Sequence, residues 1–488
     1  MIRSRAVTLM TGVLGVALLA TACTPGSNTP TTAAPTVSSV KTDAAGLGNV
    51  TLTVWDQEVR GGQAAQMKKL NDEFQKKYPN IKIKRVSRSF EDLKTTLRLA
   101  LSGNEPPDVV QANNGRSDMG EFVKANELLP LDTWAKAYGW NDRYPASVRQ
   151  YVSYSPDGKT FGEGNLYGLP RVGEVVGIYY DKKVLAAAGV KQPATWAEFE
   201  QSLQTLKDDG AVPLMFGNLE KWPAIHIFGT IQGRTTPVDQ IRGLAFGRKG
   251  PTWNTPENQK AAQTLVTWVD KGYFNSGFNG KDYDPAWQDF SKGTGAYLIG
   301  GTWLQADLQK TMGANVGFML PPGASADAKP IATGGTGLPF SITTKSKNPD
   351  AAAAYLDFIT NKNAATVLTE TENLPLAYVA DQKTGGGLQK DVFSSFATVV
   401  DGEGLVPYLD FATPTMYDTL GAALQDLLAK KSTPDQFLAT IEKDRSAFVT
   451  KNGYVTLGAG LGVRVGNADP NRRPGTTKGS RGAPGEPR

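Results

Sequence analysis

Cysteine and histidine are almost absent from this chain. Its 488 residues include one cysteine, Cys23, and one histidine, His226. A disulfide within the chain is therefore impossible, and no zinc site of cysteine and histidine ligands can form. A catalytic pair of serine or cysteine with histidine would depend on that single histidine. The sequence also lacks a dinucleotide-binding glycine motif, a phosphate-binding loop with its lysine, and calcium-loop spacing, so we expect no cofactor and no metal.

Excess charge is missing from the body of the chain. The formal net charge is +5. Arg3 and Arg5 supply two of these charges, and the segment after Gly466 supplies the rest, because its bases outnumber its acids by three. The residues between the two ends sum to zero, so the basic ends do not indicate a nucleic-acid partner. Residues 463–488 are rich in proline, glycine and arginine, and we expect them to form a disordered basic tail.

The first residues are typical of an exported lipoprotein. Two arginines precede a mostly apolar run over 6–20, which is shorter than a membrane span. The sequence Leu-Leu-Ala-Thr-Ala before Cys23 resembles a bacterial lipobox, although alanine stands where leucine is commonest. We therefore expect residues 1–22 to be a signal peptide and Cys23 to be lipidated; an ordinary signal peptide with a chance cysteine is the alternative. Residues 23–48, rich in small and polar residues, are expected to be a flexible tether.

Strand and helix patterns alternate through the body. Apolar residues alternate with polar ones over 49–56, which predicts a strand, and an apolar face recurs at helical spacing over 64–78. Further strands are expected at 81–86 and 106–110, with a helix over 90–101 between them. This order predicts a mostly parallel sheet flanked by helices.

The stretch from Gly164 to Phe199 carries the strongest local pattern. It contains Tyr-Gly-Leu-Pro, a weakly charged run ending in Tyr-Tyr-Asp, then Ala-Ala-Gly-Val, then Pro-x-Thr-Trp-x-Glu with Thr195 as a candidate helix N-cap. Together with Phe290–Trp303 and Gly334–Ile342, this order resembles the extracellular solute-binding proteins of ABC importers, in the carbohydrate-binding branch related to maltose-binding protein. The resemblance covers about residues 49–461.

The resemblance implies an α/β fold of two lobes, each a mostly parallel sheet flanked by helices, joined by hinge strands. Lobe 1 would comprise 49–170 and 301–335, and lobe 2 would comprise 171–300 and 336–462. The implied function is to capture a sugar or oligosaccharide between the lobes and to deliver it to membrane permease subunits by hinge closure. The protein would be a monomer on the extracytoplasmic face of the cell membrane, held there by its lipid anchor.

Polar and aromatic residues follow the expected strands, where ligands of α/β sheets gather. Sugars suit such residues, because carboxylates and amides bind hydroxyls and flat rings pack on C–H faces. The resemblance implies ligand contacts at Asp56, Glu58, Asn113, Asn114, Asp118, Glu174, Glu220, Trp222, Trp303, Gly335 and Tyr417. Core packing for the tryptophans and a structural ion pair for Glu174 are the alternatives. We expect His226 to be an ordinary packed or surface histidine.

A secreted glycoside hydrolase is the competing enzymatic hypothesis. It would require two carboxylates on either side of a glycosidic bond, for which Glu174 with Asp56 or Glu220 could serve. The lipid tether and the hinge-like crossings favour a binding protein instead. A surface adhesin, the third class, predicts no small ligand.

Overall fold

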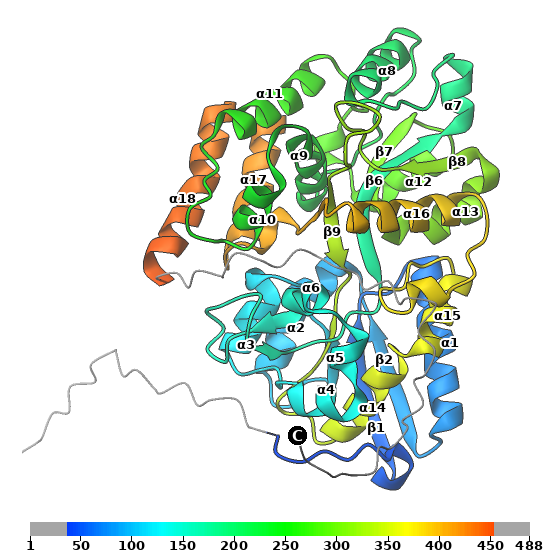
Figure 1. The fold of residues 1–488 in the computed structure, drawn as a ribbon, viewed down its shortest axis with the longest axis vertical. Coiled ribbons are helices and arrows are strands. Elements are labelled where there is room, and N and C mark those ends of the chain that lie inside the picture. The colour runs from blue at the N-terminus through cyan, green and yellow to red at the C-terminus, as the bar shows by residue number, and fades with distance from the viewer. Residues whose placement is uncertain (1–36, 453–488) are drawn as a thin grey trace, which may run out of the picture. The chain divides into compact units, whose positions relative to one another are not determined.

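Two β-sheets, joined by three stretches of chain, organise the described structure (Figure 1). The computed structural model describes residues 37–452, which all fall within one compact unit. The predicted signal peptide, the lipidation site Cys23, residues 23–36 of the tether and the tail 463–488 lie outside the described residues. Within 37–452, no helix is both long enough and apolar enough to cross a bilayer.

The first sheet has the strand order β10-β3-β1-β2. Its central strand β1 (Val50–Asp56) pairs in parallel with β2 (Ile81–Ser87) and with β3 (Val109–Gln111). The edge strand β10 (Phe340–Ile342) pairs antiparallel with β3. Helices α1 (Gly61–Lys77) and α2 (Phe90–Ser102) connect the parallel strands, so the predicted β-α-β-α-β order of this region is confirmed.

The start of α2 is fixed by its sequence. The Ser89 hydroxyl accepts a hydrogen bond from the backbone N–H of Asp92 at 3.1 Å, which caps the helix. Leu93, Leu97 and Leu101 recur every four residues and are buried on the face that packs on the sheet. This cap determines where Phe90, the first residue of the helix, lies.

The second sheet is built around β6 (Gly173–Asp181), whose residues are all buried. This strand pairs antiparallel with β7 (Tyr297–Gly301), β8 (Val316–Met319) and β9 (Ala332–Thr336), and β11 (Leu405–Val406) pairs in parallel with β9. The prediction of mostly parallel strands is therefore wrong for this sheet. β6 carries the chain into the sheet and β9 carries it back out, so the two must run in opposite directions.

The remaining elements cover the two sheets or connect their strands. A short antiparallel ribbon joins β4 (Ser153–Tyr154) to β5 (Asn165–Leu166). The helices are α3 (Glu121–Lys124), α4 (Asp132–Tyr138), α5 (Trp140–Arg143), α6 (Ala146–Arg149), α7 (Lys182–Ala187), α8 (Trp196–Asp208), α9 (Trp222–Thr235), α10 (Val238–Ala245), α11 (Pro256–Asp270), α12 (Tyr283–Ser291), α13 (Gln305–Met312), α14 (Pro349–Phe358), α15 (Lys362–Glu370), α16 (Leu388–Asp401), α17 (Met416–Leu428) and α18 (Pro434–Asn452). Single helical turns are η1 (Ala44–Leu47), η2 (Arg116–Gly120), η3 (Gln150–Val152), η4 (Phe278–Gly280), η5 (Thr302–Leu304), η6 (Gly313–Asn315), η7 (Val379–Asp381) and η8 (Leu409–Phe411).

Three connections between the sheets lie side by side. They join β5 to β6, β9 to β10, and α15 to α16. The backbone N–H of Gly173 donates to the carbonyl of Leu374 at 2.9 Å, which links the first connection to the third. The N–H of Gly337 donates to the carbonyl of Val172 at 3.0 Å, which links the second connection to the first.

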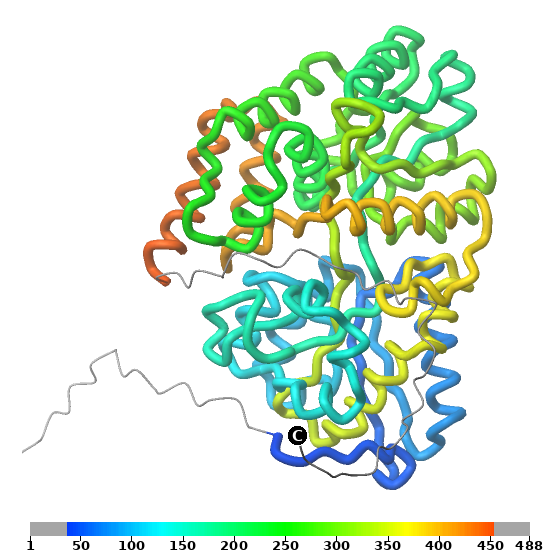
Figure 2. Tube along the Cα trace, in the orientation of Figure 1, coloured from blue at the N-terminus to red at the C-terminus, as the bar shows by residue number. Residues whose placement is uncertain are grey.

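The chain segments between these connections belong to different sheets from those that the predicted lobes required. Residues 301–335 were expected in lobe 1, yet β8 and β9 pair with β6. Residues 336–370 were expected in lobe 2, yet β10 pairs with β3, and the ring of Phe74 in α1 lies 5.3 Å from that of Tyr355 in α14. Figure 2 shows these yellow residues beside the blue N-terminal ones. The chain returns to the first sheet for β10, α14 and α15 before it crosses a third time.

The end of the predicted tether is bound to the body. The Nδ2 of Asn80 donates to the carbonyl of Ala44 at 3.0 Å, and the Thr133 hydroxyl donates to the carbonyl of Val37 at 2.7 Å. Ala44 is also buried. The prediction of a flexible segment over 23–48 is therefore wrong for its last residues, because their carbonyl groups already have partners in the folded unit.

Candidate functional site

A cavity lies between the two sheets, near the connections that join them. Its volume is about 90 Å³, which gives room for several water molecules at roughly 10–15 Å³ each. The first sheet and the β9–β10 connection contribute Gln57, Arg60, Gln63, Phe90, Asn113 and Leu338. The elements of the second sheet contribute Glu174, Trp222, Ile225, His226, Trp303, Tyr408, Asp410, Phe411 and Tyr417.

Aromatic rings form one wall of this cavity. The ring of Trp303 lies 6.2 Å from that of Trp222 and 5.4 Å from that of His226, and the His226 ring lies 5.2 Å from that of Tyr408. The indole Nε1 of Trp303 donates a hydrogen bond to the Tyr283 hydroxyl at 2.8 Å, which fixes the orientation of the indole. These rings offer flat apolar area that loses little entropy when a ligand packs on it.

The position of Trp303 depends on a glycine. Trp303 lies in the turn η5 that follows β7, and β7 ends at Gly301. A Cβ atom at Gly301 would stand 2.0 Å from the Trp303 ring, so a larger residue would force the ring to move. The Gly-Gly-Thr-Trp sequence therefore allows the indole to fold back over the end of its own strand.

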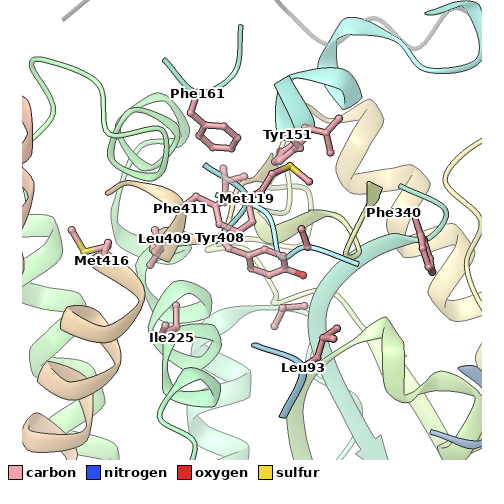
Figure 3. Packing of buried hydrophobic residues seen from close by; sticks show 14 of the residues in the cluster. Leu93, Met119, Tyr151, Phe161, Ile225, Phe340, Tyr408, Leu409, Phe411 and Met416 are labelled. Atoms are coloured by element: carbon pink, nitrogen blue, oxygen red, sulfur yellow. The ribbon is translucent and has the colours of Figure 1, made fainter. Parts of the chain in front are cut away.

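The segment after β11 supplies the part of the wall next to this ring. Figure 3 shows Tyr408, Leu409 and Phe411 close to Ile225 of α9 and to Phe161. The ring of Phe411 lies 6.0 Å from that of Phe161 and 5.6 Å from that of Tyr408. Packing on both sides holds the Tyr408 ring in place, and its hydroxyl can then orient a cavity carboxylate.

Two buried carboxylates line the cavity. Glu174 lies in β6, is 9% exposed, and accepts a hydrogen bond on Oε2 from the Tyr408 hydroxyl at 3.0 Å. Burial raises the pKa of Glu174 to about 7. Asp410, in η8, is 6% exposed, and burial raises its pKa to about 6. Both groups are strong hydrogen-bond acceptors when ionised, and each gains a donor when protonated.

His226 carries no charge near neutral pH. Burial lowers its pKa to about 3, because the imidazolium would lose its hydration in this aromatic setting. Its Nδ1 is buried and has no hydrogen-bond partner among the described residues. The imidazole therefore contributes a neutral polar ring to the cavity wall.

Direct contacts bridge the cavity from one side to the other. Arg60, at the start of α1, forms an ion pair with Asp284 of α12, with Nη2 and Oδ1 2.8 Å apart. Its guanidinium carbon also lies 5.8 Å from the centre of the Tyr283 ring. On another edge, the Tyr417 hydroxyl donates to Oε1 of Glu91 at 3.2 Å. These pairs hold the two halves of the site together in this structure.

Comparison with known proteins decides which family this architecture represents. A family profile for bacterial extracellular solute-binding proteins matches residues 60–366. The chain belongs to this family. An uncharacterised ABC transporter extracellular-binding protein of Pyrococcus horikoshii is 27% identical over 361 residues, which is 72% of this chain and 75% of that protein.

Two further similarities extend over most of the chain. The maltodextrin-binding protein MdxE of Bacillus subtilis is 25% identical over 392 residues, covering 78% of this chain and 83% of its own length. A solved structure of a chitin oligosaccharide binding protein superposes with a TM-score of 0.71 at 22% identity, covering 82% of this chain and 99% of that one. The predicted α/β fold of the periplasmic-binding-protein type is confirmed.

The solute-binding protein brings five of the predicted site residues to the cavity. Asn113, Glu174, Trp222, Trp303 and Tyr417 all line it. They come from both sheets and are separated by up to hundreds of residues, so only the folded chain unites them.

Six other predicted residues do not line the cavity. Asp56 is buried and accepts hydrogen bonds from Nε and Nη2 of Arg85, both at 2.6 Å. Glu58 is buried and pairs through Oε1 with Nη2 of Arg171 at 3.0 Å. These two acids already have cationic partners, so they hold the loop after β1 in place rather than face the cavity. The Glu58 pair also ties this loop to the first connection between the sheets.

The remaining four have other neighbours. Asn114 donates to the Tyr151 carbonyl and the Thr336 hydroxyl, both at 3.1 Å, and Asp118 pairs with Lys94 at 3.1 Å. The Glu220 carboxylate accepts from the backbone N–H of Tyr283. Gly335, with φ of 138°, pairs with Glu174 across the β6–β9 ladder, which places it at a crossing where a side chain would be strained.

The sequence analysis did not select most of the residues that line the cavity. The residues that it did not select are Gln57, Arg60, Gln63, Phe90, Ile225, His226, Leu338, Tyr408, Asp410 and Phe411. His226 could have been found, because it lies one helical turn after Trp222 and must share its face of α9. Tyr408, Asp410 and Phe411 follow a strand of two residues, which is too short to give a periodic signal.

The described part of the chain was also searched for clusters of metal-binding side chains. Across 37–452, the histidine, cysteine, aspartate and glutamate side chains form no group of three or more that could hold an ion.

Proposed function

We propose that this solute-binding protein captures a sugar or oligosaccharide in the cavity between its sheets and delivers it to the permease of an ABC importer. The observation that carries the proposal is a set of aromatic rings beside hydrogen-bonding groups in a cavity between the two sheets. Trp222 and Trp303 would pack on the C–H faces of a sugar, and Glu174 would bind its hydroxyls. The maltodextrin and chitin-oligosaccharide binding proteins to which the chain is similar support a saccharide ligand.

Hinge closure would couple capture to delivery. We assign the first lobe to the elements of the first sheet with α14 and α15, and the second lobe to those of the second sheet with α16–α18. The three connections between the sheets would be the hinge. Arg60–Asp284 and Tyr417–Glu91 join the two proposed lobes and would break if the lobes moved apart, so they would favour the closed form.

The remaining parts of the proposal concern the setting of the protein. It would act as a monomer, held at the extracytoplasmic face of the membrane by lipids on Cys23, and it would bind its sugar without cleaving it. The Leu-Leu-Ala-Thr-Ala-Cys sequence supports the anchor, and membership in a family of binding proteins supports a function without catalysis.

A saccharide screen tests the proposal. Monosaccharides and oligosaccharides are added to the purified full-length protein, thermal unfolding is followed, and hits are titrated by calorimetry. A ligand at about 100 times its Kd should stabilise the protein by about 2.7 kcal/mol. The sugar should be recovered unaltered by chromatography. Stabilisation by no saccharide would contradict the proposed function, and recovery of cleaved sugar would favour a hydrolase.

A further inference from the structure

The described cavity lining has more acidic than basic side chains. Among its described lining residues, the acids are Glu174 and Asp410, and the cation is Arg60. Arg60 is already paired with Asp284 at 2.8 Å and lies over the Tyr283 ring. The nearby Lys94 is paired with Asp118 at 3.1 Å. Both cations therefore already have a carboxylate partner outside the cavity lining.

Among the described residues, neither cavity carboxylate forms a salt bridge, although the charges of Arg60 and Lys94 act on Glu174 and Asp410 from farther away. Glu174 accepts from a neutral phenol, the Tyr408 hydroxyl, at 3.0 Å. For Asp410, the hydrogen-bond donor within the described structure is its own backbone amide. Both side chains are more than nine-tenths buried, and burial raises the pKa of each. Carboxylates buried in this way normally have a cation or several donors nearby, because an unpaired buried charge is costly.

The rest of the wall suits a cation. His226 is neutral, so it does not repel positive charge. The rings of Trp222, Trp303 and Tyr408 surround the same space, and the negative faces of such rings attract an ammonium group. An anionic ligand would meet the two acids, while the described cations at this site, Arg60 and Lys94, are already paired with other acids.

We infer that the saccharide taken by this cavity carries a protonated amine, which binds to a cavity carboxylate, Glu174 or Asp410, beside the aromatic wall. This inference rests on the proposed function and specifies the substrate class of the same site. A hydroxyl would give either acid a hydrogen bond, but an ammonium group would also neutralise its charge. Hydrogen bonds that involve a charged group are roughly twice as strong as neutral ones, so we expect the amine to bind about tenfold more tightly.

Matched sugars test the inference on the full-length protein. Glucosamine, galactosamine and mannosamine are each compared by calorimetry at pH 7.5, above the pKa of both carboxyl groups, with the parent hexose and with its N-acetyl derivative. At least one amine should bind about tenfold more tightly than its neutral counterparts. If every amine binds no more tightly than its parent, the inference is overturned. Neutral sugars that bind in that case leave the proposed function standing, whereas binding by neither these sugars nor neutral oligosaccharides contradicts both.

Two isosteric variants locate the effect. Glu174→Gln and Asp410→Asn remove one negative charge each and keep the shape of the side chain. Each should reduce the ratio of amine to neutral-sugar affinity several-fold, and the double variant should bring it close to one. Asp72→Asn, at an exposed acid on α1, removes the same charge far from the cavity and should leave the ratio unchanged. An amine preference that survives in the double variant would overturn the inference.

Discussion

Replacing Trp303 by alanine removes a ring from the centre of the aromatic wall. The indole lies 5.4 Å from the His226 ring and 6.2 Å from the Trp222 ring, and it donates to the Tyr283 hydroxyl at 2.8 Å. If a sugar packs on this ring, the variant should lose binding free energy of the size found for aromatic anchors at the centre of an interface, about 2 kcal/mol or more. The Kd for the saccharide should then rise by roughly 30-fold or more.

The loss of stability in this variant must be separated from the loss of affinity. Truncating a packed tryptophan costs up to about 3–5 kcal/mol of folding free energy, and the partly buried Trp303 should cost somewhat less. Trp196 is a matched control, because it is also partly buried and its ring is stacked 5.8 Å from that of Trp268, away from the cavity lining. Trp196→Ala should lower the unfolding free energy by a similar amount and leave the Kd unchanged.

Calorimetric titration of both variants, with denaturant unfolding of each, is the assay. Trp303→Phe adds a graded test, since it retains a ring but loses the hydrogen bond to Tyr283, and it should bind with intermediate affinity. The reasoning would be refuted if Trp303→Ala kept its affinity within about threefold, or if Trp196→Ala weakened binding to the same extent.

Three further predictions concern the surroundings of this ring. Gly301→Ala should weaken saccharide binding by displacing the Trp303 ring, whereas Gly300→Ala, whose new Cβ would come no closer than 3.2 Å to other atoms, should have a much smaller effect in the same titration. Glu174→Gln should be more stable relative to wild type at pH 8 than at pH 4.5, by up to about 3 kcal/mol in denaturant unfolding of the ligand-free protein. The folded pKa of Glu174 is about 7 against 4.5 unfolded, so its contribution is fully present below pH 4.5 and is lost as the pH rises through 7; an equal difference at both pH values would contradict this. Arg60→Ala should shift the ligand-free protein toward an open form and increase its radius of gyration in solution scattering, and an unchanged radius would argue against the ion pair as a closing contact.

The elements that depend on nearby residues could be predicted from the sequence. Thr195 caps α8 and forms a capping box with Glu198, because all the groups involved lie within four residues. Likewise, the alternation of apolar and polar residues over 49–56 correctly predicted β1, and the apolar face over 64–78 correctly predicted α1. The order of motifs along the chain was enough to predict the fold class, but not the strand directions of the second sheet or the sheets to which 301–370 belong.

Contacts between distant residues could not be predicted in this way. Asp56 ends β1 and Glu58 follows it, as a sugar site would require, but the sequence does not show that Arg85 and Arg171 pair with their carboxylates. Arg60 and Asp284 are 224 positions apart, and the sequence around neither residue indicates that they form an ion pair. The antiparallel pairing of β6 depends on where the chain crosses between sheets, which local periodicity does not record.

The most direct test of the account is a crystal structure of the full-length protein with a saccharide identified by the screen. The account predicts one sugar ring packed against Trp303, with a hydroxyl or amine of that sugar within hydrogen-bond distance of the Glu174 carboxylate. A saccharide bound elsewhere on the protein, with the cavity between the sheets holding only solvent, would contradict it.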